Sequence, residues 1–137
     1  MSKFFAWRLF VSRDMAKVGY MILSKGKWKG RQIVSKEWID ESTRARITLE
    51  EKEKNHLEYH IKYGYLWWCR NFYVKDKKVK NRRNIESFLA GGNGGQRIYV
   101  FPTVDIAVIF TGGNYNSPLA SQQETIILEN YILPAIL

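Results

Sequence analysis

Apolar positions in the first part of the chain recur at helical spacing. They fall every three or four residues from Met15 to Ile22, which predicts an amphipathic helix over residues 12–25 with Ser12 as its N-cap. A second N-cap at Ser35, followed by apolar residues on one helical face, predicts a short helix over residues 35–44. The chain therefore begins with two helices.

In the second half of the chain the side-chain pattern changes to a period of two residues, which is typical of β-strands. The aromatic segment Tyr63–Cys69 has the composition of a strand, and further strands are expected over residues 86–111. Within that range Gln96–Phe101 alternates between two sets of side chains, and Asp105–Phe110 is almost continuously apolar. Because only a short turn containing Pro102 joins these two segments, they should pair as an antiparallel hairpin.

The remaining segments complete an α+β pattern. Residues 70–84 are strongly basic and are expected to form a solvated loop at the tip of a hairpin. A terminal helix is predicted over residues 118–133, with Ser121 and Glu124 at the spacing of a capping box and Pro134 as its end. This order predicts a single unit over residues 1–137, an antiparallel sheet with helices packed on one face.

Charge gives a second indication of what the chain contacts. The sequence has 22 basic and 13 acidic residues, a formal net charge of +9, and the excess lies in residues 1–31 and 75–83. Such a chain is attracted weakly and without specificity to anionic polymers. A more specific version is a module that binds single-stranded nucleic acid by stacking bases on Trp67, Trp68 or Tyr73 and holding phosphates with residues 75–83.

The sequence does not support several other classes of protein: disulfide-stabilised, metal-binding, secreted or membrane-spanning. One cysteine, Cys69, excludes an internal disulfide framework and is expected to behave as a small buried apolar residue. His56 and His60 have no third ligand at metal-binding spacing, so neither a metal nor a cofactor is expected. No segment has the pattern of a signal peptide or is long and apolar enough to span a membrane, and the compartment stays open.

Glycine is concentrated in one segment, Ala90–Gln96, which reads AGGNGGQ. A phosphate-binding loop would need a helix after the glycines, whereas a strand is expected here. Two interpretations remain: a local turn or bulge, and a strand whose bare backbone approaches a ligand closely.

Three blocks of the chain together resemble serine β-lactamase-like hydrolases, a family that includes class C β-lactamases, penicillin-binding proteins and 6-aminohexanoate-dimer hydrolase. The blocks are residues 12–42, residues 63–68 (YGYLWW) and residues 88–114 (FLAGGNGGQRIYVFPTVDIAVIFTGGN), and they resemble the C-terminal portion of that fold. The resemblance implies a partial β-lactamase/transpeptidase-like fold.

The resemblance also implies roles for individual residues. Asn93-Gly94-Gly95 corresponds to the family's K-T-G triplet, and the backbone N–H of Gln96 to an oxyanion-hole donor. Asn93, Gly94 and Gly95 would then contact substrate, together with Tyr65 and Trp68 if these line the same cleft.

Two motifs of the family have no counterpart here. No tyrosine is followed two positions later by asparagine, and the one S-x-x-K match, Ser24 to Lys27, falls where the first helix should end. The expected function is therefore one wall of an active site for amide, ester or β-lactam hydrolysis. The chain alone would be inert, and a small acyl or amide substrate would bind only once the missing N-terminal half is supplied. Besides the active-site wall and the nucleic-acid-binding module, a third interpretation of the chain is a purely structural remnant of such an enzyme.

Overall fold

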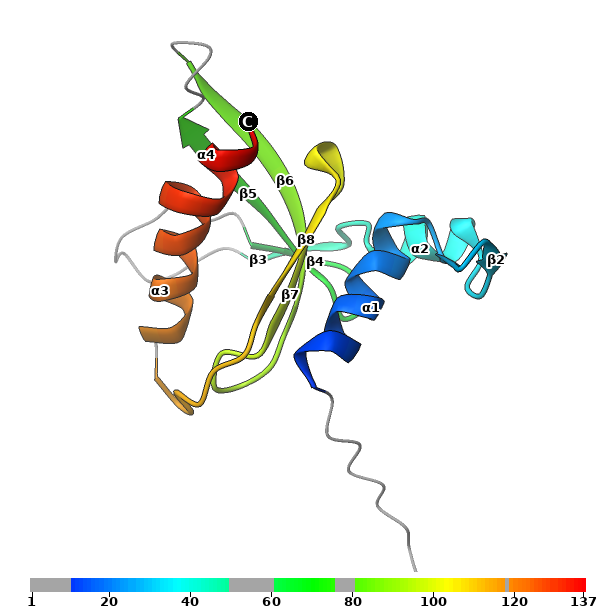
Figure 1. Cartoon of the computed structure of the whole chain (residues 1–137), viewed down its shortest axis with the longest axis horizontal. Helices are drawn as coiled ribbons and strands as arrows, with labels where there is room; N and C mark the ends of the chain where they lie inside the picture. Colours follow the sequence, from blue (N-terminus) through cyan, green and yellow to red (C-terminus); the bar gives the residue numbers. More distant parts are fainter. Residues whose placement is uncertain (1–10, 50–60, 76–80, 118) are drawn as a thin grey trace, which may run out of the picture.

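The chain forms a sheet with helices on both sides. The computed structural model describes residues 11–49, 61–75, 81–117 and 119–137. Six strands of these residues form one antiparallel sheet in the order β3-β4-β5-β6-β7-β8 (Figure 1). Their bounds are β3 Ile47–Leu49, β4 Ile61–Tyr63, β5 Trp68–Lys75, β6 Arg82–Gly91, β7 Arg97–Phe101 and β8 Ile106–Phe110. The α+β class expected from the sequence is confirmed.

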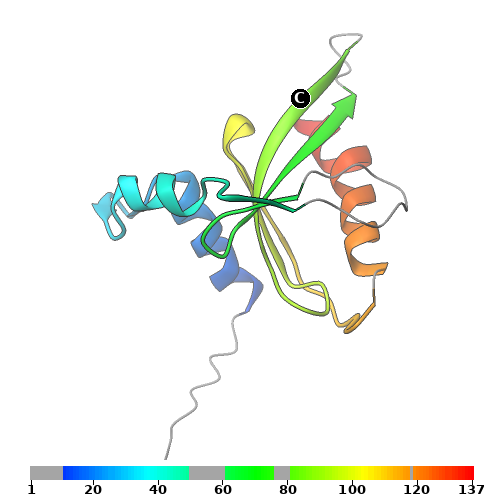
Figure 2. The same cartoon turned by 180° about the vertical axis from the view of Figure 1, so that it is seen from behind.

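The helices divide between the two faces of this sheet. Helices α1 (Ser12–Leu23) and α2 (Lys36–Ser42) lie on one side, with a small hairpin of β1 (Lys27–Trp28) and β2 (Arg31–Gln32) between them along the chain. Helix α3 (Leu119–Ile127), the π-helical turn η2 (Leu128–Ile132) and α4 (Leu133–Ile136) cover the other side (Figures 1 and 2).

The alternation in β7 explains why both faces are covered. Val100 is fully buried among residues that include Ile22 of α1 and Ile39 of α2. Tyr99 and Phe101, which point the opposite way, are buried against the C-terminal helical segment. The expectation that the first and the terminal helix pack on the same face of the sheet is therefore wrong. The side chains of β7 are apolar on both faces of the sheet, so each face must be covered by its own helices.

The first helix lies close against the sheet. A Cβ at Gly19 would lie 2.9 Å from the Cβ of Ala107, so glycine permits the short separation between α1 and β8. Helix α1 begins after Val11, which is its N-cap residue, and it ends at Leu23, so the prediction of Ser12 as the N-cap was displaced by one residue. The second N-cap is confirmed, since Ser35 Oγ accepts a hydrogen bond from the backbone N–H of Trp38 at 3.1 Å.

The hairpin of β7 and β8 agrees with the sequence prediction. The two strands are antiparallel, with Arg97 opposite Phe110 and Phe101 opposite Ile106. A short 3-10 turn, η1 (Pro102–Val104), joins them and ends at Asp105, whose φ is +51°. β7 also pairs with residues 88–91 of β6 on its other side.

Two boundaries in the middle of the chain differ from the prediction. Residues 63–69 are not one strand, because β4 ends at Tyr63 and the chain turns through Gly64–Trp67 before β5 begins. Leu66 in this turn has a φ of +63°. Residues 70–84 are not a loop throughout, since β5 and β6 pair from Trp68 opposite Leu89 to Lys75 opposite Arg82. The core residues Phe72, Val74 and Ile85 in this ladder outweigh the basic composition around them.

The two ends of the C-terminal helical segment differ from the sequence prediction. The backbone N–H of Leu119 donates to Ser117 Oγ at 3.3 Å, whereas Glu124 is buried and faces β7 instead of completing a capping box. Pro134 does not end the helix, because the π-helical turn η2 precedes α4 and Pro134 sits in the first turn of α4, where proline is tolerated. Pro118 lies outside the described residues.

Candidate functional site

Two loops meet at one end of the β7–β8 hairpin. Residues 91–96 lead into β7 and residues 111–117 leave β8, so antiparallel pairing brings them side by side. The backbone N–H of Asn114 donates to the carbonyl of Gly94 at 3.0 Å. Asn93 and Asn116 bond twice: Asn93 Nδ2 donates to Asn116 Oδ1 at 2.8 Å, and the Asn116 backbone N–H donates to Asn93 Oδ1 at 3.0 Å. Asn93 thus fastens one loop to the other.

The two central glycines occupy backbone conformations that L side chains rarely adopt. Gly94 and Gly95 have φ angles of +98° and +94°, and both are buried. A Cβ at Gly94 would lie 2.8 Å from two ring carbons of Tyr115. The need for glycine at position 94 therefore comes from the turn and from packing within the chain, and it does not require a ligand.

Gln96 is held from three directions. Its side-chain Nε2 donates to the carbonyl of Gly112 at 2.6 Å. Its own carbonyl accepts from the backbone N–H of Gly92 at 2.9 Å and from Arg97 Nη1 at 3.1 Å. The backbone N–H of Gln96 takes part in none of the hydrogen bonds found between described residues. A fixed N–H without an internal acceptor is a group that can bind an anionic oxygen.

Arg97 connects this loop to helix α3. Its Nη1 also donates to the carbonyl of Gly92, and its Nε lies 3.2 Å from Glu124 Oε2. The hydroxyl of Tyr99 donates to the same carboxylate oxygen at 3.3 Å. Burial raises the pKa of Glu124, and the positive charge of Arg97 acts against that rise. The side chain of Glu124 is 5% exposed, so this ion pair is shielded from water.

The phenol of Tyr99 gives a test of this buried cluster. Burial raises the pKa of Tyr99 from 10.0 to about 12. The folded state holds the proton more tightly than the unfolded chain, so the stabilisation is present below pH 10.0 and is lost as the pH rises to about 12. We expect a loss of roughly 3 kcal/mol in unfolding free energy over that interval. Urea denaturation of the wild type and of Tyr99→Phe at several pH values measures it, and an equal decline in the two proteins would contradict it.

Tyr65 and Trp68 make their ring contacts outside the two loops. Tyr65 stacks on Trp38, with ring centroids 5.6 Å apart, and lines an apolar cavity of about 580 Å³ between α1, α2 and the turn after β4. Trp68 contacts the ring of Tyr63 at a centroid distance of 4.3 Å. The lining of this cavity includes none of residues 93–96. The placement of Tyr65 and Trp68 around one cleft with Gly94 stays a prediction.

A polar cavity of about 570 Å³ lies on the face of the sheet that α1 and α2 cover in part. It is lined by residues of β4, β5 and β6 and of the α2–β3 region, among them Lys62, Cys69 and Glu86. Cys69 is only half-buried, contrary to expectation, and its Sγ donates to the carbonyl of Thr43 at 3.3 Å. Burial raises the pKa of the Cys69 thiol, which keeps it protonated and a poor nucleophile.

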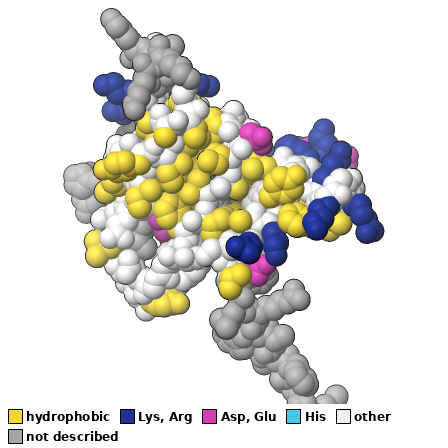
Figure 3. Space-filling view, viewed as in Figure 1, with side chains coloured by type: hydrophobic (Ala, Val, Ile, Leu, Met, Phe, Trp, Pro, Cys, Tyr) yellow, Lys and Arg dark blue, Asp and Glu magenta, His cyan; other side chains and the backbone are white. Residues whose placement is uncertain are grey.

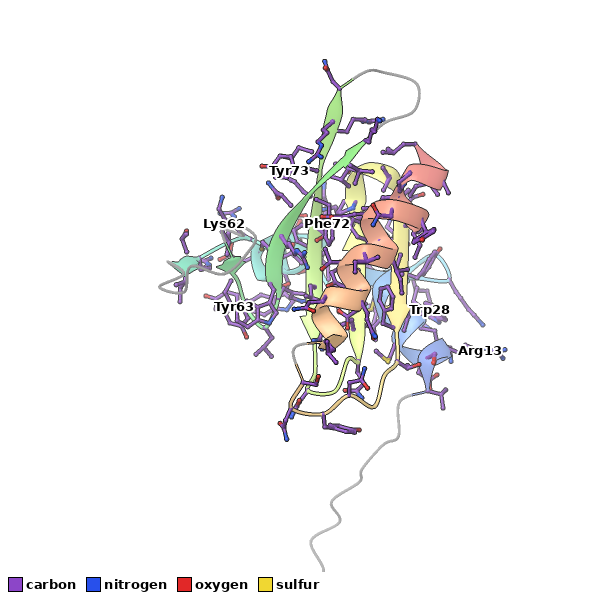
Figure 4. The ribbon with its side chains drawn as sticks, turned by 90° about the vertical axis from the view of Figure 1, so that its left-hand side faces the viewer. Arg13, Trp28, Lys62, Tyr63, Phe72 and Tyr73 are labelled. Carbon is purple, nitrogen blue, oxygen red and sulfur yellow. The ribbon has the colours of Figure 1, made fainter. Side chains whose placement is uncertain are left out.

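The aromatic residues suggested for nucleic-acid binding are not equally exposed. Trp67 packs against a core cluster, and Trp68 is half-buried beside Tyr63. Tyr73 is 57% exposed and projects from the β5–β6 hairpin on the same side of the molecule as Lys62 (Figure 4). Tyr73 is thus the member of this group with a ring open to stacking, and residues 76–80 lie outside the described part.

The S-x-x-K match does not have the placement of a nucleophile and its lysine. Ser24 caps the C-terminal end of α1 and Lys27 belongs to β1, so this pair is not at the N-terminus of a helix. His56 and His60 lie outside the described residues. In the part of the chain that the structure covers, no group of three or more His, Cys, Asp or Glu side chains is placed to hold a metal. Within that same part, no helix is long and apolar enough to cross a membrane.

Sequence reasoning missed the second loop of the site. Asn116, Gly112 and Tyr115 all contact residues 93–96, yet none was singled out. A signal was present, because the strand Ile106–Phe110 is followed by a second glycine-asparagine run, TGGN, at residues 111–114. No family model matches the chain, and a search of curated proteins finds no significant match.

Proposed function

We propose that this chain is the C-terminal part of a serine β-lactamase-like hydrolase, which in complete form hydrolyses an amide, ester or β-lactam. In that enzyme the chain supplies one wall of the active site, and the backbone N–H of Gln96 is one donor of the oxyanion hole. The nucleophilic serine, its lysine and the tyrosine motif belong to the missing N-terminal half.

One observation carries the proposal. The N–H of Gln96 stands directly before the inner strand β7, has no acceptor among the described residues, and belongs to a residue fixed through both its carbonyl and its side chain. A donor of this kind does not have to reorient when negative charge develops on a substrate oxygen, and an oxyanion hole requires such a preorganised donor. The glycine loop, β7 and β8 all lie within the resembling block of residues 88–114.

Asn93 has a more limited role than the family's triplet implies. Both atoms of its amide group bond to Asn116, so its side chain stabilises the loop and does not provide the cation found in many relatives. Substrate orientation therefore falls to backbone groups of this loop and to the missing half. Tyr65 contributes only if the complete cleft extends to the apolar cavity that it lines, and Trp68 only if the cleft reaches the ring of Tyr63.

Hydrolysis assays test this proposal. Define the nucleophile half as the N-terminal part of a complete hydrolase of this family, ending before the block that corresponds to residues 12–42. The chain alone should not turn over nitrocefin or p-nitrophenyl esters, and the mixture of chain and nucleophile half should.

Two controls separate the sources of activity. Removing the serine of the nucleophile half should abolish turnover, because a hydrolase without its nucleophile retains only roughly 10³- to 10⁴-fold catalysis over water. Ser24→Ala in this chain should have no effect. Turnover by the isolated chain that disappears with Ser24→Ala would refute the proposal.

A further inference from the structure

The side chain of Arg97 links helix α3 to the loop that carries the Gln96 N–H. Its Nε lies 3.2 Å from Glu124 Oε2, and its Nη1 donates to the carbonyls of Gly92 and Gln96. Arg97 lies opposite Gly91 in the β6–β7 ladder, and a Cβ at Gly91 would lie 3.1 Å from Cδ and 3.3 Å from Nε of Arg97. The bare backbone at Gly91 therefore leaves room for the arginine side chain to reach both the loop and α3.

The peptide between Gly95 and Gln96 depends on its two neighbours for its orientation. The preceding peptide is held because the carbonyl of Gly94 accepts from the backbone N–H of Asn114 at 3.0 Å. The following peptide is held through the carbonyl of Gln96, which accepts from Arg97 Nη1 at 3.1 Å. Gly95, with a φ of +94°, has no Cβ to restrict the peptide between them. The direction of the Gln96 N–H therefore depends on both restraints.

Glu124 is a charged residue in otherwise apolar surroundings. The C-terminal helical segment packs on the sheet through buried residues such as Leu128 and Phe72, and hydrophobic side chains also gather on the face drawn in Figure 3. The side chain of Glu124 is only 5% exposed, and its Oε1 has no hydrogen-bond partner among the described residues. Such a buried oxygen is destabilising, and well-packed apolar side chains often stabilise a protein at least as well as a buried ion pair. Packing alone therefore does not account for this glutamate.

We propose that Glu124 and Arg97 are positioning residues for the oxyanion-hole donor. Glu124 holds the guanidinium of Arg97, and the guanidinium holds the carbonyls of Gly92 and Gln96. This set of contacts, called the clamp below, fixes the direction of the Gln96 N–H. The catalytic use of that N–H rests on the proposed function, whereas the clamp consists of contacts within this chain.

Nuclear magnetic resonance of the chain alone tests the clamp. In the wild type the ¹⁵N order parameter of the Gln96 N–H should be about 0.85, the value of rigid backbone. Arg97→Lys keeps a positive charge near Glu124, but a single ammonium group does not bridge the carboxylate and both loop carbonyls. The order parameter should therefore fall below about 0.6, the range of flexible backbone. A wild-type order parameter together with a wild-type residual dipolar coupling, which reports the direction of the N–H, would overturn the inference.

An apolar replacement of the whole cluster separates positioning from stability. The triple variant Arg97→Met, Tyr99→Phe and Glu124→Leu removes the ion pair together with the hydroxyl that donates to Glu124. The midpoint of its urea denaturation should stay close to that of the wild type, because no buried polar side chain of the cluster loses its partner. The Gln96 N–H should nevertheless become as mobile as in Arg97→Lys. A lower midpoint with an unchanged Gln96 N–H would show a purely structural role, and Arg97→Lys decides if the triple variant does not fold.

Glu129→Gln provides the matched control. Glu129 is a second acid of the C-terminal helical segment and lies in η2. Of these two acids, Glu124 is the one with a contact to Arg97 among the described residues. Glu129→Gln should therefore leave the order parameter of the Gln96 N–H at about 0.85. A fall as large as that in Arg97→Lys would show that this N–H responds to any change in the C-terminal segment, which would count against the clamp.

Kinetics of the mixture with the nucleophile half connect the clamp to catalysis. The triple variant should lower kcat by roughly tenfold or more with little change in KM, approaching the roughly 10²- to 10³-fold loss caused by removing an oxyanion-hole donor. An active mixture whose kcat is unaffected by the triple variant would overturn the positioning role. If no mixture hydrolyses substrate while the Gln96 N–H loosens as expected in the chain alone, the proposed function is refuted and the clamp is supported.

Discussion

Replacing Gly94 by alanine should lower the free energy of unfolding by about 2–4 kcal/mol. Two costs add at this position. A φ of +98° is unfavourable for any residue with a Cβ, and the new methyl group would lie 2.8 Å from the ring of Tyr115. Urea denaturation followed by tryptophan fluorescence measures the change.

Gly113 provides the matched control for this variant. It lies in the opposing loop, has a φ outside the left-handed range, and a Cβ there would meet no atom within 4 Å. Gly113→Ala should therefore change stability by no more than about 0.5 kcal/mol. If Gly94→Ala were as stable as Gly113→Ala, the conformation of the glycine loop described above would be incorrect.

Removing Arg97 should have an effect of similar size for a different reason. Arg97→Leu leaves the carboxylate of Glu124 buried without its ion-pair partner, and breaking such a pair costs about 3–5 kcal/mol. It also removes the hydrogen bonds from the guanidinium to the carbonyls of Gly92 and Gln96. Chemical denaturation should show the loss, whereas Lys17→Leu, which breaks an exposed ion pair with Asp14, should change stability little.

The pH dependence of this variant has a defined sign. Burial already raises the pKa of Glu124, and loss of the Arg97 charge removes an influence that lowers it. The folded state of Arg97→Leu therefore holds a proton on Glu124 more tightly than the unfolded chain does, so its deficit should shrink as the pH falls through the raised pKa. A deficit that stays constant on acidification would show that Glu124 is not the group left unpaired.

Local patterns predicted the fold best where they involved neighbouring segments. The β7–β8 hairpin followed from a short turn between two apolar runs, and the helix after Ser35 followed from its cap. Both depend on interactions within a few residues. The covering of both sheet faces also had a signal, because β7 is apolar at consecutive positions, but the sequence prediction read only one face as buried.

Predictions failed where tertiary contacts outweighed local composition. The basic segment 70–84 forms a paired ladder because Phe72 and Val74 enter the core, which composition does not show. Glu124 has the spacing of a capping residue, yet it bonds to Arg97 and Tyr99, which are distant in sequence. The loop 111–117 was missed for the same reason, since its contacts with Asn93, Gly94 and Gln96 arise only when β7 and β8 pair.

The direct test of the central claim is the amide resonance of Gln96. A ¹⁵N-labelled sample of this chain is combined with the nucleophile half, and the serine of that half is then modified with a fluorophosphonate, whose phosphoryl oxygen imitates the oxyanion of the tetrahedral intermediate. If Gln96 supplies an oxyanion-hole donor, its amide proton should move downfield on modification by more than the amide protons of Gly92 and Asn93. A complex that forms and becomes modified while the Gln96 resonance stays unchanged would contradict the claim.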